Sequence, residues 1–365
     1  MKRGRLLLPL LFVLLLALPL LLLLALPDRD FSENENRYLS KAPELDAEGF
    51  LEGSLQTELE AWAADQFPGR DGWIAGVTLL NKAEGLREIG GAWLGAEGYY
   101  LEIHRPEDFD WEKYRRNLSY LNKLAEDAGV PATALLVPSA AAALPELLPR
   151  GAEVYDPAEA LRVARELLPE AELPDLTAAL RAEPREQVFY RTDHHWTAAG
   201  ALRAYRCLPE GFGNWDGTLE PFCTDFYGTT FSKTLDPAAE GDRIELFSLP
   251  DSVRAEADGQ AIEVYDVSAA ARKDQYTVYE GGNHGLVRFR GGCTNGKILL
   301  VLKDSFANCL APLLTADYET VLLVDLRYYP GTVRALLAEE RPDALLFVYE
   351  MSGLAESDDL VKLLL

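Results

Sequence analysis

The sequence is poor in the residues that most often build metal and redox centres. Its 365 residues include only four cysteines, four histidines and two methionines. No two cysteines stand in a CxxC spacing, and no cysteine–histidine cluster has the spacing of a zinc site. We therefore expect neither a metal centre nor a cofactor.

Basic residues are also scarce. The chain has 35 Lys and Arg against 59 Asp and Glu, which gives a formal net charge of -24. Such a surface repels phosphate groups, so nucleic acid is excluded as a partner. No internal repeat is visible, and the 48% apolar and 26% charged residues are ordinary for a globular protein.

One long apolar run is present, at the N-terminus. Lys2, Arg3 and Arg5 precede an uncharged stretch over residues 6–26, and a membrane-spanning helix needs roughly 20 such residues. We expect residues 1–27 to form an uncleaved membrane anchor, with its basic end in the cytoplasm and the remainder of the chain outside. The alternative is a cleaved signal peptide, although Ala25-Leu26-Pro27 is a poor cleavage site.

An outside location permits disulfides. Cys207 and Cys223 bracket a loop rich in Gly and Asp and could pair. Cys309 fits core packing better, and the state of Cys293 is left open.

Two regions follow the anchor. We expect a juxtamembrane N-terminal region over 28–105 and an α/β domain over 106–365, with an irregular insertion at about 210–290 that is rich in Gly and aromatic residues and has short strands. Alternating strands and helices in the second region predict a parallel sheet flanked by helices. The predicted strands are 133–138, 188–190, 297–303, 320–325 and 344–349, and the predicted helices are 111–129, 157–168, 176–181, 197–207, 306–314 and 333–340.

Two stretches carry the chemistry that the sequence predicts. Asp193-His194-His195-Trp196 follows a predicted strand, and Ser305 lies between a buried strand and a helix. A serine hydroxyl needs a base to take its proton and a carboxylate to orient that base. We predict that Ser305 is a nucleophile, His195 its base and Asp193 the orienting group. Asp325 also ends a predicted strand, and sites lie at the carboxyl ends of parallel strands, so the three ends should converge.

An extended backbone would place Asp193 and His195 on one face and His194 on the other. This alternation argues against a metal site formed by all three residues. It also predicts that the paired carboxylate raises the pKa of His195.

Several residues keep two interpretations. Ser305 could simply cap the following helix, or its backbone N–H could stabilise an oxyanion. Asn283, in Gly281-Gly282-Asn283, is either a second oxyanion donor or part of a turn. The aromatic and basic residues that could line a substrate cleft, or be structural, are Trp196, Arg327, Tyr328 and Tyr329.

The motif Asp193-His194-His195-Trp196 resembles the one that names the DHHW family of bacterial proteins. That family is similar to the SGNH-hydrolase-like alginate O-acetyltransferases, which carry an Asp-x-His-Trp motif and a later Ser nucleophile. Further stretches that resemble the family, from about Phe31 to the end of the chain, are Ser32–Arg37, Asp65–Asp71, Gly281–Asn283, Lys303–Asn308 and Asp325–Tyr329.

The resemblance implies an SGNH-like fold in which Asp193, His195 and Ser305 form the catalytic set. The chain departs from the usual Gly-Asp-Ser block of these hydrolases, because Lys303 takes the Gly position. The Asp and His also precede the Ser, but geometry rather than chain order defines a triad.

The function expected from these features is O-acyl transfer, of an acetyl group, on a cell-surface or secreted polysaccharide. The partners would be the polysaccharide acceptor and a membrane-bound acyl-donor protein. The alternatives are a carbohydrate acetylesterase, and a non-catalytic glycan-binding or assembly protein on a degenerate SGNH scaffold.

Overall fold

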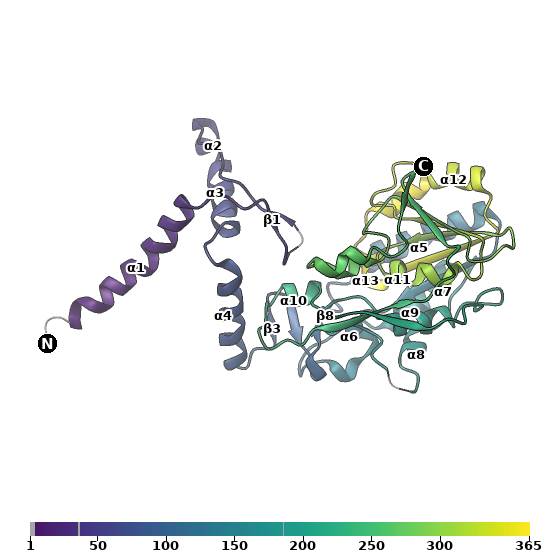
Figure 1. Cartoon of the computed structure of the whole chain (residues 1–365), viewed down its shortest axis with the longest axis horizontal. Helices are drawn as coiled ribbons and strands as arrows, with labels where there is room; N and C mark the ends of the chain where they lie inside the picture. The colour runs from purple at the N-terminus through teal and green to yellow at the C-terminus, as the bar shows by residue number, and fades with distance from the viewer. Residues whose placement is uncertain (1–3, 36, 185) are drawn as a thin grey trace. The chain divides into compact units, whose positions relative to one another are not determined.

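The computed structural model describes residues 4–35, 37–184 and 186–365, which form two compact units (Figure 1). The first unit comprises the residues through Leu86 together with Ser232–Pro237. The second comprises Arg87–Phe231 and Ala238–Leu365. The small sheet of residues 88–101 belongs to the second unit.

Helices dominate the first unit. Buried Asp65 organises its polar part, because the carboxylate accepts hydrogen bonds from the Arg37 guanidinium and from the Ser40 backbone N–H at 2.8 Å. The elements are α1 (Gly4–Ala25), β1 (Phe31–Ser32), β2 (Arg37–Tyr38), α2 (Ala47–Glu52), α3 (Ser54–Asp65) and α4 (Arg70–Ala83). Within the described residues, we find no helix with the length and apolar character needed to cross a membrane, so the predicted anchor is not confirmed.

An eight-stranded mixed sheet is the centre of the second unit. Its strand order is β11-β10-β12-β14-β13-β15-β6-β7. The strands are β6 (Ala132–Val137), β7 (Ala171–Glu172), β10 (Arg254–Ala257), β11 (Gln260–Ile262), β12 (Leu286–Arg290), β13 (Ile298–Lys303), β14 (Thr320–Val324) and β15 (Ala344–Glu350). The five strands from β14 to β7 run parallel, as predicted.

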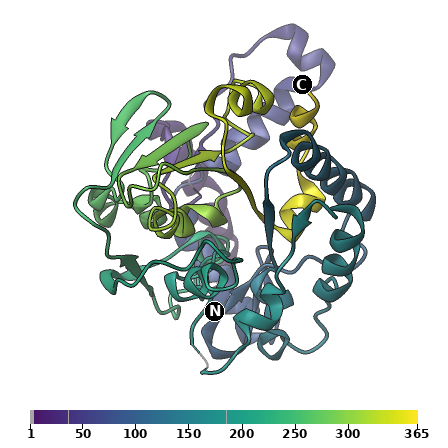
Figure 2. The same cartoon turned by 90° about the vertical axis from the view of Figure 1, so that its right-hand side faces the viewer.

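Successive side chains of the central strands pack alternately into two separate hydrophobic cores on the two faces of the sheet. In β13, Leu299 and Val301 face one core, whereas Leu300 and Leu302 face the other. Strands buried on both faces need apolar residues at every position, which explains their continuous apolar runs. The first core includes residues of α8 (Leu176–Leu180), α9 (Ala198–Tyr205) and α11 (Phe306–Leu314). The second includes residues of α5 (Trp111–Ala128), α7 (Pro157–Leu167), α12 (Val333–Glu340) and α13 (Met351–Glu356). Figure 2 shows α5 beside the yellow C-terminal helices.

The insertion contributes short strands to the sheet. Strand β12 pairs antiparallel with β14, β10 pairs antiparallel with β12, and β11 pairs antiparallel with β10, so the sheet is mixed rather than purely parallel. A separate antiparallel pair, β8 (Leu219–Phe226) and β9 (Asp242–Phe247), precedes them. A small antiparallel sheet precedes the central one and consists of β3 (Glu88–Ile89), β4 (Ala92–Leu94) and β5 (Tyr100–Leu101).

All four cysteines are free thiols, so the suggested pairing of Cys207 with Cys223 is wrong. Cys309 is fully buried in the first core, which confirms its packing role.

Gly200, in α9, is required by close packing against a neighbouring loop. A Cβ atom at this position would lie 2.2 Å from the backbone carbonyl oxygen of Val188 and 2.9 Å from the Trp196 Cβ. Because a backbone carbonyl cannot move aside like a side chain, α9 would have to shift from the loop.

We therefore predict that Gly200→Ala lowers the free energy of unfolding by about 1–3 kcal/mol, the usual cost of overpacking a core. Denaturant titration measures this change. Gly76→Ala is the matched control, because a Cβ atom there meets nothing within 4 Å and helix interiors favour Ala over Gly by roughly 0.5–1 kcal/mol. A Gly200→Ala protein as stable as wild type would contradict the packing argument.

Candidate active site

A tight loop, rather than a strand of the sheet, presents Asp193 and His195. Phe189 and Trp196 form an isolated antiparallel bridge, the Tyr190 N–H donates to the His195 carbonyl at 3.1 Å, and residues 191–195 bend between them. The predicted strand 188–190 is therefore wrong as part of the sheet. Beneath the bend, the buried carboxylate of Asp242 accepts from the Thr192 N–H at 2.8 Å and the Thr192 hydroxyl at 2.7 Å.

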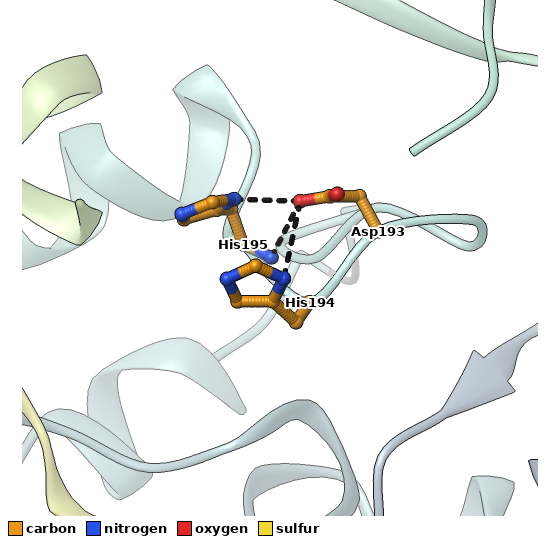
Figure 3. A group of neighbouring side chains, drawn as sticks. All are labelled: Asp193, His194 and His195. Atoms are coloured by element: carbon orange, nitrogen blue, oxygen red, sulfur yellow. Dashed lines mark hydrogen bonds and ion pairs between the residues drawn. The ribbon is translucent and has the colours of Figure 1, made fainter. Parts of the chain in front are cut away.

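Asp193, His195 and Ser305 lie in one hydrogen-bonded line. His195 Nδ1 is 2.6 Å from Asp193 Oδ1, and His195 Nε2 is 2.7 Å from Ser305 Oγ (Figure 3 shows the first of these contacts). The carboxylate can only accept, so Nδ1 carries the proton and Nε2 is left to accept from the serine hydroxyl. The structure thus brings together the three residues that the sequence singles out, although His195 and Ser305 are 110 positions apart.

Ser305 does not cap its helix. The residue precedes α11, but the Phe306 N–H donates at 2.9 Å to Oδ1 of Asp304 instead, and Asp304 Oδ2 accepts from the Glu350 N–H at 2.7 Å. Asp304 therefore holds the turn, and the Ser305 hydroxyl is free for His195. Within the described residues the Ser305 N–H has no hydrogen-bond partner, which suits the predicted oxyanion donor at a helix start.

The insertion supplies a clamp on Asp193 that the sequence does not reveal. Thr229 opens α10 (Thr229–Ser232), and it donates to Asp193 Oδ2 from its backbone N–H at 2.8 Å and from its hydroxyl at 3.0 Å. The preceding Gly228 is needed for this approach, because a Cβ atom there would lie 2.2 Å from Asp193 Oδ2. A Gly-Thr pair in a segment without periodicity gives no signal that would identify this contact.

His194 lies on the same side as His195, contrary to the prediction. The segment is bent rather than extended, so the two imidazole centroids are only 3.9 Å apart (Figure 3). His194 Nδ1 is 2.7 Å from Thr229 Oγ1. Donor atoms of Asp193, His194 and His195 lie within 4.8 Å of one another and could hold a metal ion. In this structure these atoms bond to one another, to Thr229 and to Ser305.

Burial and the neighbouring imidazole set the charge state of the site. Burial and the charge of His194 lower the pKa of His195 to about 4, and they outweigh the opposite effect of Asp193. The predicted rise in the pKa of His195 is therefore wrong. For His194, burial lowers the pKa but the attraction of Asp193 outweighs it, so the net shift is upward. Burial would raise the pKa of Asp193, but the two imidazoles hold it well below its usual range. His195 is thus neutral at neutral pH, as a base must be.

The other predicted residues do not join this line. Trp196 is fully buried, donating from Nε1 to the Phe306 carbonyl at 3.0 Å, so its ring packs rather than contacts a substrate. Asn283 is exposed, within the Gly281–Gly285 turn. Tyr328 is 51% exposed under the Arg327 guanidinium, which lies 5.3 Å from its ring, and Tyr329 is half-buried.

Asp325 does not converge on Ser305. Its carboxylate accepts from Arg327 Nε at 2.9 Å and Nη2 at 2.6 Å, and it lies 3.9 Å from Lys303 Nζ. Lys303, at the position where related hydrolases have Gly, is 1% exposed and donates to Asn308. The long side chain therefore turns into the protein and leaves the serine accessible.

The family of the chain follows from these features and from one match. The model of the family described as "SGNH hydrolase-like domain, acetyltransferase AlgX" matches residues 92–275, half of the chain. The chain belongs to this family. The matched segment contains Asp193 and His195 and ends before Ser305. No curated protein matches the chain.

Solved structures share the fold of this AlgX-type chain. A DHHW family protein from Eubacterium siraeum is 22% identical over 76% of this chain and 95% of its own, with a TM-score of 0.63. PatB1 of Bacillus cereus, solved with a sulfonyl adduct, is 21% identical over 74% of this chain and 99% of its own, with a TM-score of 0.60. The O-acetyltransferase domain of AlgJ from Pseudomonas putida is 17% identical over 74% of this chain and 94% of its own, with a TM-score of 0.50.

Replacing His194 should change the titration of His195. His194→Gln removes a neighbouring charge that lowers the pKa of His195, so that pKa should rise from about 4 toward the ordinary His value of about 6.5. The imidazole would then become charged, and unable to accept the Ser305 proton, at a higher pH than in wild type. NMR titration of protein with labelled histidine rings measures the shift.

His284→Gln is the control, because His284 Nδ1 lies 3.5 Å from Asp258 and its Nε2 bonds to the Glu280 carbonyl rather than to Asp193, His195 or Ser305. An unchanged pKa of His195 in His194→Gln would contradict the electrostatic account.

Proposed function

We propose that this protein transfers an acyl group, an acetyl, through a covalent ester on Ser305. The observation that carries the proposal is the unbroken line from Asp193 through His195 to Ser305, with contacts of 2.6 and 2.7 Å. A capping serine would have its hydroxyl turned to the helix backbone, whereas this hydroxyl meets a neutral, oriented imidazole. Membership of an acetyltransferase family supports the same chemistry.

The first half of the proposed reaction forms the acyl-enzyme. Ser305 Oγ attacks the carbonyl carbon of the donor ester while its proton passes to His195 Nε2. Asp193 stabilises the imidazolium that results. The carbonyl oxygen becomes an oxyanion that the Ser305 N–H at the start of α11 can stabilise. The intermediate then collapses, the bond to the leaving alcohol breaks, and His195 returns the proton to that alcohol.

The second half repeats these steps with a new acceptor. His195 takes a proton from the acceptor hydroxyl, whose oxygen attacks the acyl carbon and releases Ser305. A sugar hydroxyl gives a transferase and water gives an esterase. We favour a sugar of a cell-surface polysaccharide, outside the cytoplasm, because the family is named for an acetyltransferase and the AlgJ domain of similar fold is an O-acetyltransferase. The donor would be a membrane-bound acyl carrier.

A non-catalytic glycan-binding protein is the competing function. A non-catalytic scaffold does not require a buried carboxylate, a neutral imidazole and a serine that does not cap its helix to lie within hydrogen-bond distance of one another. We therefore place the enzyme first.

Ser305 should react with serine-directed reagents. PatB1 carries a sulfonyl adduct in its solved structure, and we expect an aryl sulfonyl fluoride to label Ser305 and p-nitrophenyl acetate to be turned over. Mass spectrometry locates the label. Ser305→Ala should abolish both reactions, and His195→Gln should come close to doing so, since loss of the base in subtilisin costs about a millionfold. Ester turnover by Ser305→Ala at the wild-type rate would reject the assignment.

The hydroxyl of Thr229 should matter, and that of its neighbour should not. Thr229→Val removes one hydrogen bond to the buried carboxylate of Asp193. A hydrogen bond to a charged group contributes about 1.5–3 kcal/mol, so turnover should fall by about tenfold or more at unchanged fold. Thr230→Val is a matched control, because the buried Thr230 hydroxyl has no hydrogen-bond partner among the residues that the structure describes. Equal activity of the two variants, measured with the same ester, would refute the role of Thr229.

A further inference from the structure

Aromatic rings enclose the imidazole of His195. The ring of Tyr276 lies parallel to it, with centroids 4.0 Å apart and an interplanar angle of 10°. The centroid of the Phe306 ring lies 5.1 Å from that of His195, at an interplanar angle of 55°, and the His194 centroid lies at 3.9 Å with an angle of 36°. Of these three neighbours, Tyr276 alone covers a full face of the imidazole.

Tyr276 also contacts the backbone of the nucleophile. Its hydroxyl lies 3.3 Å from the Ser305 carbonyl oxygen, to which it can donate. Only 7% of Tyr276 is exposed, and the rings of Tyr190 and Tyr279 meet it edge-on at 6.4 and 5.1 Å. The side chain comes from the short helix η4 (Gln275–Val278) of the insertion. One fixed ring therefore touches both members of the proton-transfer pair.

We propose that Tyr276 is a positioning residue that holds the His195 imidazole in register with Ser305 and favours its charged form during proton transfer. The inference rests on the proposed function. Tyr276 is not in the line of hydrogen bonds and would act through His195 rather than on the substrate.

Two physical effects support this role. A ring that stacks at 4.0 Å blocks rotation of the imidazole out of its plane, so Nε2 stays 2.7 Å from Ser305 Oγ; a misplacement of about 1 Å can cost about 100-fold in rate. The face of an aromatic ring also attracts a cation. Because His195 is neutral before the reaction and charged during it, this attraction stabilises the transition state more than the ground state.

The test separates the ring of Tyr276 from its hydroxyl. Tyr276→Phe keeps the stacking, and Tyr276→Leu removes it while leaving an apolar residue. The rate of sulfonylation of Ser305 by an aryl sulfonyl fluoride is measured for both, together with kcat and KM for p-nitrophenyl acetate. Tyr276→Phe should react at a rate close to that of wild type, whereas Tyr276→Leu should lose between about tenfold and 100-fold in kcat and in labelling rate, at nearly constant KM.

NMR gives a readout that does not depend on catalysis. The carbon-bound ring protons of His195 should be shifted upfield by the stacked ring in wild type and in Tyr276→Phe, and this shift should be lost in Tyr276→Leu. Tyr265→Leu is the control for loss of a tyrosine, because Tyr265 belongs to the insertion and its hydroxyl bonds to the Phe247 carbonyl instead. It should leave both the shift and the labelling rate of folded protein unchanged.

The outcomes distinguish the inference from the proposed function. A wild-type protein that does not react at Ser305 would overturn the proposed function, and this inference with it. A reactive wild type whose Tyr276→Leu variant reacts equally fast would overturn the inference alone. So would a Tyr276→Phe variant as impaired as Tyr276→Leu, because the hydroxyl rather than the ring would then be responsible.

Discussion

The buried carboxylate of Asp193 is the constraint on which the rest of the site depends. Its side chain is 2% exposed, and an ionised group is costly to bury unless its acceptor sites are filled. Four donors fill them: the backbone N–H and Nδ1 of His195 on one oxygen, and the N–H and hydroxyl of Thr229 on the other. The loop and the insertion must therefore lie together for the charge to be tolerated, and the orientation of His195 follows.

The sheet fixes the other partner. Apolar residues on both faces of β13 lock the strand between two cores, and Asp304 ties the turn after it to β15 through the Glu350 N–H. These contacts fix the position of Ser305 at the end of the strand. Its hydroxyl makes no capping hydrogen bond to the helix. A rigid strand end carries the nucleophile, and a bent loop clamped by the insertion carries the base.

The parts of the fold with strong periodicity could be predicted from the sequence. Helices α5 and α12 and strands β13, β14 and β15 lie close to their expected bounds, because apolar spacing there directly reflects burial. Ser305, His195 and Asp193 were also predictable, since few residue types perform this chemistry and the motif is distinctive. The triplet Val188-Phe189-Tyr190 was wrongly predicted as a strand of the sheet. It is buried and apolar like such a strand, but it forms one side of a tight loop and pairs through the isolated Phe189–Trp196 bridge. The assumption that the chain is extended at His194 failed for the same reason. Thr229 and Tyr276 could not be found, because their contacts come from long-range packing of a segment without periodicity.

The antiparallel strands that the insertion adds to the sheet have a consequence for the order of folding. Asp193 and Thr229 are separated by 36 residues, and His195 and Ser305 by 110. Contacts over such separations form only after the entropy of closing long loops has been overcome. Strand β12 pairs with β14, and β14 lies beyond Ser305 in the chain. A nascent chain therefore contains all of the motif long before it contains Ser305, which lies 110 residues after His195, and the site is incomplete until that residue is in place.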